Sequence, residues 1–105
     1  MIRLASNEGA LGPSPMAVAA FEEMASKIHR YPDGASAELR AALAGLHDLD
    51  AARIVCGAGS DELIALLCRA YAGPGDEILH PEHAFLMYSI AARTAGATPV
   101  SAPER

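Results

Sequence analysis

The chain has 105 residues, of which 51% are hydrophobic and 20% charged, and its formal net charge is −5. That length allows one small domain with a modest core, and the composition is ordinary for a globular protein. The basic residues are scattered and no run of about 18 apolar residues occurs, so we expect neither a nucleic-acid partner nor a membrane span, and the N-terminus lacks a signal-peptide segment.

The first thirteen residues are predicted to form an extended arm that leads into a helix. The helix is expected to begin at Ser14-Pro15, because serine is a good N-cap and proline fits the first helical position. His29-Arg30 is expected to end it, and Tyr31–Gly34 to form a turn. Its apolar face would contain Val18, Phe21, Ala25 and Ile28.

A second helix is predicted after Ser36 as its cap, and a third from about Ser60. Between them, the apolar run Arg53–Cys56 indicates a short buried strand. Glycine and proline in Gly73–Asp76 are expected to end the third helix. The predicted buried stripes are Leu39, Leu43 and Leu46 in the second helix, and Leu63, Leu66, Leu67 and Ala70 in the third.

The last part of the chain is predicted as strand, helix, strand. Glu77–His80 forms a strand, a helix follows with Phe85, Tyr88, Ala92 and Ala95 on one side, Gly96 ends it, and Ala97–Val100 forms a third strand. Strands that alternate with helices indicate an α/β fold with a parallel sheet and right-handed crossovers. Three strands leave an exposed sheet edge, so we expect the chain to be part of a larger protein.

Cys56 and Cys68 both lie in apolar stretches and are expected to be reduced core residues of a cytoplasmic protein. The histidines and cysteines show no spacing typical of a metal site, and we expect none.

The segment Gly57–Glu62 carries the strongest local signal for binding. A predicted strand runs through a glycine-rich turn into a helix N-terminus, which presents unpaired N–H groups to an anion. The same pattern is compatible with a tight turn in which Ser60 merely caps the helix, and the acids Asp61 and Glu62 oppose an anion unless they point away from it. Neither the Walker A motif nor Gly-x-Gly-x-x-Gly is present.

Other candidates also have two interpretations. The phenol of Tyr31 is suited to bind a phosphate or to pack against neighbouring helices. The aromatics between Pro81 and Tyr88 follow a strand at the expected ligand edge of an α/β sheet, where they would stack on a planar cofactor or pack in the core. Asn7 on the arm would contact a substrate or partner subunit, or remain solvated.

The order of these motifs resembles a known family. The motifs are Ser6-Asn7-Glu8, Leu11–Pro15, Arg30–Gly34, Gly57–Glu62 and Pro74–Glu77. In this order they resemble the N-terminal part of the histidinol-phosphate aminotransferases, within the fold-type-I pyridoxal-phosphate (PLP) enzymes. The resemblance covers essentially the whole chain. It implies an arm, first helix and turn over residues 1–35, followed over residues 36–105 by the incomplete beginning of the PLP-binding large α/β domain.

The resemblance also implies roles for individual residues. Gly59, Ser60 and Asp61 correspond to the family's cradle for the PLP phosphate, which uses mainly backbone donors. Tyr31 matches a tyrosine that reaches the PLP of the partner subunit in a homodimer. Phe85 matches the aromatic that stacks on the pyridine ring, whereas an alignment from Pro81 would put His83 there.

Two differences from the family stand out. The family's arm usually reads Asn-Glu-Asn-Pro, but Gly9-Ala10 follows Asn7-Glu8 here, which puts contacts of the arm with substrate in doubt. The family's Schiff-base lysine, its pyridinium-pairing aspartate and its substrate-phosphate arginine all lie further along the chain. Lys27, the only lysine, matches no such motif, so we expect no catalytic residue in this segment and no activity from it alone.

The function implied by the resemblance is transamination of a phosphorylated imidazole substrate in histidine biosynthesis, in the full-length parent. Histidinol phosphate and 2-oxoglutarate would give imidazole-acetol phosphate and glutamate. A related PLP enzyme, such as an aromatic aminotransferase or a threonine-phosphate decarboxylase, is an alternative, as are an aminotransferase-like module of a regulator and a small complete anion-binding domain. The arm directly after Met1 favours the enzyme over the regulator, and the exposed sheet edge disfavours a complete domain.

Overall fold

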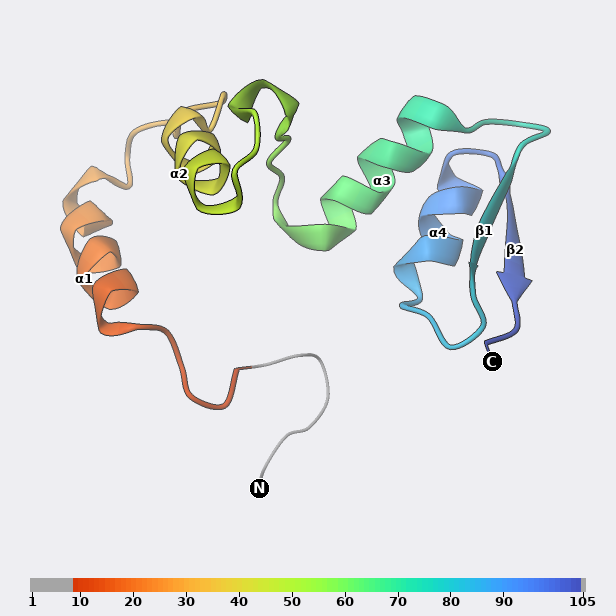
Figure 1. The fold of residues 1–105 in the computed structure, drawn as a ribbon, viewed down its shortest axis with the longest axis horizontal. Helices are drawn as coiled ribbons and strands as arrows, with labels where there is room; N and C mark the ends of the chain where they lie inside the picture. The colour runs from red at the N-terminus through yellow and green to blue at the C-terminus, as the bar shows by residue number, and fades with distance from the viewer. Residues whose placement is uncertain (1–8, 105) are drawn as a thin grey trace. The chain divides into compact units, whose positions relative to one another are not determined.

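The computed structural model describes residues 9–104, and Asn7 therefore lies outside the described part. The chain divides into two compact units, Met1–Ser36 and Ala37–Arg105, and each is described by itself. Figure 1 shows the elements in chain order. They are α1 Pro15–Met24, the 3-10 turn η1 Ala25–Lys27, α2 Ala37–His47, the 3-10 turn η2 Ala51–Arg53, α3 Gly59–Tyr71, β1 Glu77–Pro81, α4 Met87–Thr94 and β2 Thr98–Ala102.

The first unit contains α1, and its start is as predicted. The Ser14 side chain accepts a hydrogen bond from the Ala17 N–H at 3.2 Å, and a proline occupies the first turn. The predicted end at His29-Arg30 is wrong, because the α-helix stops at Met24 and continues only as η1. Most of the predicted apolar face is exposed, with Phe21 76% and Ile28 82% accessible.

The turn in the first unit lies two residues later than predicted. The Ser36 N–H donates to the Asp33 carbonyl, and the Ala35 N–H donates to Asp33 Oδ1, both at 3.0 Å. An aspartate side chain that accepts from the backbone two residues on is a common way to close a turn. The turn is therefore Asp33–Ser36, and Tyr31 precedes it.

The second unit begins with α2, which follows Ser36 directly. The φ angle of Ser36 is +47°, in the left-handed region, whereas an N-cap residue usually has extended backbone. The predicted buried stripe is wrong for this structure, since Leu39 and Leu46 are exposed and Leu43 is half-buried.

The connection from α2 to α3 corrects a second prediction. Arg53–Cys56 was expected to be a buried strand, but Ala51–Arg53 is η2 and residues 54–57 belong to no strand. The backbone of Ile54 is extended, with φ −105° and ψ 126°, and Val55 is 71% exposed. A strand needs a hydrogen-bonded neighbour, and the described residues supply none for this segment.

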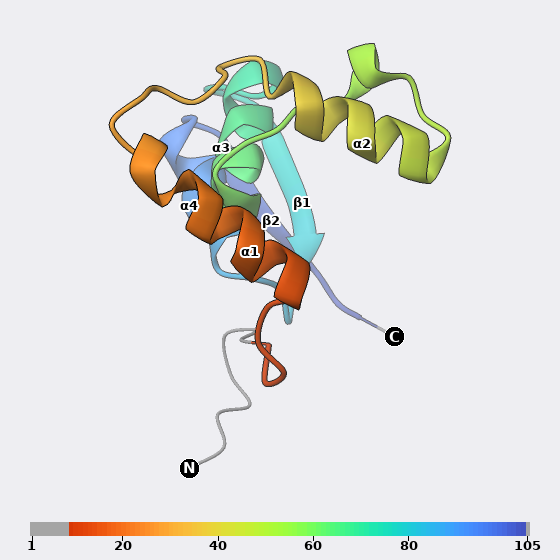
Figure 2. The same cartoon turned by 90° about the vertical axis from the view of Figure 1, so that its left-hand side faces the viewer.

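The remaining elements form a parallel βαβ unit, as predicted. β1 pairs with β2 in parallel, in the register Glu77↔Thr98 to Pro81↔Ala102. α4 connects the strands and contacts both of them, and Gly96 follows its C-cap with a φ of +84°, which suits a glycine after a helix. Figure 2 shows α4 beside the two strands. The α/β prediction is confirmed by this unit, with two paired strands in place of the three expected.

The small core lies between α3, α4 and the sheet. The buried apolar residues among residues 9–104 are Cys68, Ala91, Ala92 and Ala97. Helix α3 packs against α4 and its buried residue is Cys68, so the predicted buried stripe is wrong here, with Leu66 44% and Leu67 60% exposed. Both cysteines are free, as expected. Cys68 is buried in the core, as predicted, whereas Cys56 is only half-buried.

Candidate functional site

The glycine-rich turn before α3 has a conformation that requires glycine. Gly59 has φ +84°, which side chains rarely adopt, and nothing lies within 4 Å of the place where its Cβ would be. Gly57 is constrained differently, because a Cβ there would lie 3.0 Å from Glu62 Oε2 and 3.0 Å from Leu63 Cδ2. The turn thus needs Gly59 for its positive φ angle, and Gly57 because a side chain there would crowd those of Glu62 and Leu63.

The N–H groups of the turn fall into two sets. The Gly59 N–H donates to the Gly57 carbonyl at 2.9 Å, and the Ala58 N–H donates to Glu62 Oε2 at 2.5 Å. Ser60 and Asp61 lie in the first turn of α3, where the helix supplies no acceptor. Neither donates its backbone N–H to any group within residues 9–104, and both residues are exposed. These two donors are open to an anion at the positive end of the helix.

The two acids of this turn, Asp61 and Glu62, differ in their contacts. The Glu62 carboxylate folds back onto Ala58, whereas Asp61 is exposed and shows no hydrogen bond within the described residues. Sequence reasoning counted both acids against anion binding and missed the bond of Glu62. The spacing of an acid a few residues after a helix start, as in a capping box, was the signal that could have indicated it.

The connection from β1 to α4 carries the aromatic candidate. Phe85 is 51% exposed and contacts Tyr88 edge to face. The alternative candidate, His83, is largely exposed and places Nδ1 3.0 Å from Glu104 Oε2. His83 thus already has a partner near the end of β2, whereas Phe85 leaves half of its surface accessible.

The glycine-rich turn and Phe85 each precede a helix of the second unit, α3 and α4. In Figure 1 both strands end, and α4 begins, at the lower side of the βαβ unit. The carboxyl edge of a parallel sheet is where α/β proteins bind ligands. Tyr31 belongs to the first unit, and its side chain is fully exposed.

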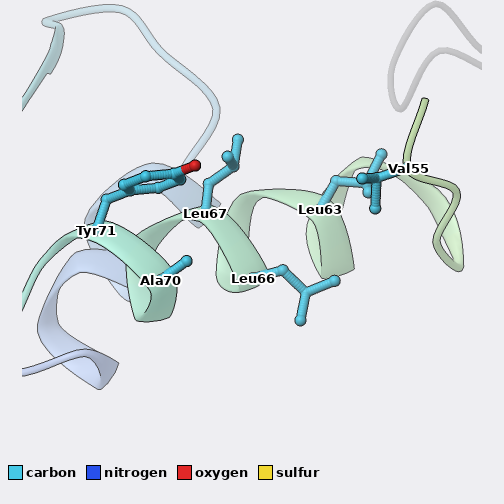
Figure 3. A pocket seen from close by; sticks show the side chains of 6 residues that line it. All are labelled: Val55, Leu63, Leu66, Leu67, Ala70 and Tyr71. Atoms are coloured by element: carbon cyan, nitrogen blue, oxygen red, sulfur yellow. The ribbon is translucent and has the colours of Figure 1, made fainter. Parts of the chain in front are cut away.

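A second feature of this unit is an apolar groove of about 420 Å³ along α3. Figure 3 shows its lining, which is Val55, Leu63, Leu66, Leu67, Ala70 and Tyr71. These include the four residues predicted as the buried stripe of this helix. The groove contains no charged side chain, so it offers packing surface and no acid–base chemistry.

Residues 9–104 contain neither a metal site nor a membrane-spanning helix. No group of three or more histidine, cysteine, aspartate or glutamate side chains is placed to hold a metal ion. No helix in this part of the chain has the length and apolar character needed to cross a membrane.

Comparisons with known proteins place the chain among aminotransferases. The family described as aminotransferase class I and II matches residues 1–105. A histidinol-phosphate aminotransferase of Paramagnetospirillum magneticum is 64% identical over 104 residues, and one of Rhodospirillum centenum is 62% identical over 105. They match 99% and 100% of this chain, which spans 29% of the length of each relative.

A solved structure has a similar fold. It is histidinol-phosphate aminotransferase from Sinorhizobium meliloti in complex with pyridoxal-5'-phosphate, with a TM-score of 0.89 and 24% identity. The match covers 95% of this chain and 27% of that one. At this identity the likeness concerns the fold, and it confirms the α/β architecture predicted for a segment of such a protein.

Proposed function

The chain belongs to the class I and II aminotransferase family, and we propose that it is the N-terminal segment of a PLP-dependent histidinol-phosphate aminotransferase. The parent would transfer an amino group between glutamate and a phosphorylated imidazole substrate of histidine biosynthesis, in the reversible reaction that interconverts histidinol phosphate plus 2-oxoglutarate and imidazole-acetol phosphate plus glutamate. Identity of 62–64% to proteins named for this activity, over essentially the whole segment, supports the substrate class. The motif-based resemblance is thereby confirmed for the family.

The residues present fit a phosphorylated cofactor. The observation that carries the proposal is the pair of open N–H groups at Ser60 and Asp61, at the start of α3 and beside open space at Gly59. We assign the phosphate to these donors and to the Ser60 hydroxyl. The Gly59 N–H, which the resemblance also gives to the phosphate, is bonded to the Gly57 carbonyl here, so Gly59 is assigned the role of leaving open space beside the donors. The half-exposed ring of Phe85 is assigned to stack on the pyridine ring.

This segment and the rest of the parent are proposed to contribute different groups to catalysis. Bound PLP supplies an electron sink for the carbanion formed at the substrate Cα. The segment holds the cofactor by its phosphate and orients its ring, which keeps the reacting atoms in place. Lys27 lies in η1 of the first unit and belongs to no cofactor motif, so the proton-transferring lysine is assigned to the remainder of the parent.

The proposal extends to assembly and organisation. We assign Tyr31, which is fully exposed, to the cofactor of the partner subunit in a homodimer, and Asn7 to the substrate side. Residues 1–35 would form the arm, first helix and turn, and residues 36–105 the start of the large PLP-binding domain. We also propose a cytoplasmic location for the parent, which a biosynthetic role with small-molecule substrates supports.

The decisive experiment uses the full-length parent. Purified protein is titrated with PLP and followed by absorbance, and amino transfer to 2-oxoglutarate is assayed with histidinol phosphate and, as a comparison, with phenylalanine and threonine phosphate. Tight PLP binding with preferred use of histidinol phosphate is expected. A parent that binds no PLP, or that prefers phenylalanine, would contradict the proposal.

A further inference from the structure

Glu62 makes a hydrogen bond that the proposed cofactor contacts do not explain. Its Oε2 accepts from the Ala58 N–H at 2.5 Å, so the carboxylate spans back from the first turn of α3 to the residue that precedes the helix. A carboxylate accepting from a backbone N–H is a charge-assisted bond, which is about twice as strong as a neutral one. The bond therefore ties the glycine-rich turn to the helix.

The surrounding turn is built around this carboxylate. Gly57 lacks the Cβ that would lie 3.0 Å from Glu62 Oε2, and the Gly59 N–H is bonded to the Gly57 carbonyl at 2.9 Å. The left-handed Gly59 then directs the chain into α3. The space at Gly57, the hydrogen bond from Gly59 to Gly57 and the left-handed φ angle of Gly59 are thus all consistent with one conformation of the turn.

We propose that Glu62 is a positioning residue for the phosphate cradle, an inference that rests on the proposed function. Its carboxylate holds the Ala58 N–H and keeps the turn in the conformation that leaves the Ser60 and Asp61 N–H groups open. The phosphate contacts those groups, and Glu62 acts on the phosphate only through the turn.

The opposite role for Glu62 is that of a competing anion. A carboxylate near a helix N-terminus reduces the attraction of that end for a phosphate. However, Glu62 bonds to Ala58, outside the helix, and not to Ser60 or Asp61. It therefore leaves the Ser60 and Asp61 N–H groups free to donate to the phosphate. This placement favours a positioning role for Glu62 over competition with the phosphate.

The test compares two ligands in the full-length parent freed of cofactor. The dissociation constants of PLP and of pyridoxal, which lacks the phosphate, are measured by absorbance titration. Glu62→Ala should weaken PLP about tenfold and leave pyridoxal nearly unchanged, because only the phosphate uses the cradle. Glu62→Gln should restore PLP affinity to within about twofold, since an amide oxygen still accepts from Ala58.

A matched control and a second variant complete the design. Glu38, an acid in the first turn of α2, is the control, and Glu38→Ala should change neither constant. Gly57→Ala, whose Cβ would meet the Glu62 carboxylate, should also weaken PLP, and the double variant with Glu62→Ala should lose little more.

The outcomes separate this inference from the proposed function. A parent that binds no PLP overturns both. If the parent binds PLP, three results overturn the inference alone: unchanged PLP affinity in Glu62→Ala, an equal loss for PLP and pyridoxal, or tighter PLP binding in Glu62→Gln. Should Glu62→Ala fail to fold, the comparison of Glu62→Gln with Gly57→Ala decides the same question.

Discussion

The ring of Phe85 meets the ring of Tyr88 edge to face, with centroids 6.4 Å apart and planes at 85°. Such a contact contributes about 0.5–1.5 kcal/mol beyond the burial of area. It joins the connection after β1 to the first turn of α4 and so limits the orientations of the Phe85 ring. Phe85 nevertheless remains 51% exposed, which leaves surface for a planar ligand.

Phe85→Ala is expected to weaken PLP binding in the full-length parent and to shift the absorption of bound PLP. The loss should be about 1 kcal/mol or more, because the ring contact disappears. His83→Ala should have much less effect, since His83 pairs with Glu104. Absorbance titration of both variants gives the ranking, and the opposite ranking would mean that the segment is misaligned by two residues.

Gly59→Val is expected to weaken PLP retention in the full-length parent. Valine is strained at a φ of +84°, by about 1–3 kcal/mol, and its branched side chain would enter the open space at the turn. The rate of PLP dissociation, followed by absorbance, measures the effect. Unchanged affinity would show that the turn has no part in cofactor binding.

Ser60→Ala should be milder than Gly59→Val. It removes one hydroxyl donor and leaves the backbone N–H in place, so we expect a loss on the order of 1 kcal/mol in PLP binding. The same dissociation measurement applies. A loss larger than that of Gly59→Val would move the main phosphate contact from the backbone to the Ser60 side chain.

Tyr31 is predicted to act across the dimer interface, which mixed dimers of the parent can test. One subunit carries Tyr31→Ala and the other lacks the catalytic lysine. If Tyr31 serves the partner's cofactor, the mixed dimer has one doubly damaged site and one intact site, and the intact site should turn over at a near-wild-type rate.

Two outcomes would count against this role of Tyr31. If it acts within its own subunit, both sites of the mixed dimer are damaged and no activity returns. The design requires that Tyr31→Ala alone clearly lowers activity, and a fully active single variant would remove Tyr31 from the site.

Residues 1–105 alone are expected to be marginally stable and prone to associate. The buried apolar residues of the described part are small, and the groove along α3 is uncovered. Sedimentation should therefore show self-association, and thermal melting a broad or low transition. A clean monomer that melts sharply at high temperature would contradict this prediction.

Local signals were predictable from the sequence alone. Ser14-Pro15 determined the start of α1 through an N-cap and a fixed φ angle, and Gly96 determined the end of α4. The β1–α4–β2 unit followed from the alternation of apolar runs and turn residues. The N-cap and the glycine after α4 depend on interactions within a few residues, which any chain with this sequence carries, whereas the strand pairing of the unit also joins residues as far apart as Glu77 and Thr98.

Tertiary structure decided what depends on partners distant in the chain. Ile54 is extended as expected, yet residues 54–57 form no strand because a strand exists only beside another strand, and residues 9–104 offer none to it. Leu63, Leu66 and Leu67 of α3 line an open groove while Cys68 of the same helix is buried, because burial depends on which surface lies opposite. The bond from Glu62 to Ala58 likewise required the path of the turn, since Gly57 provides the space for it only once the chain is folded.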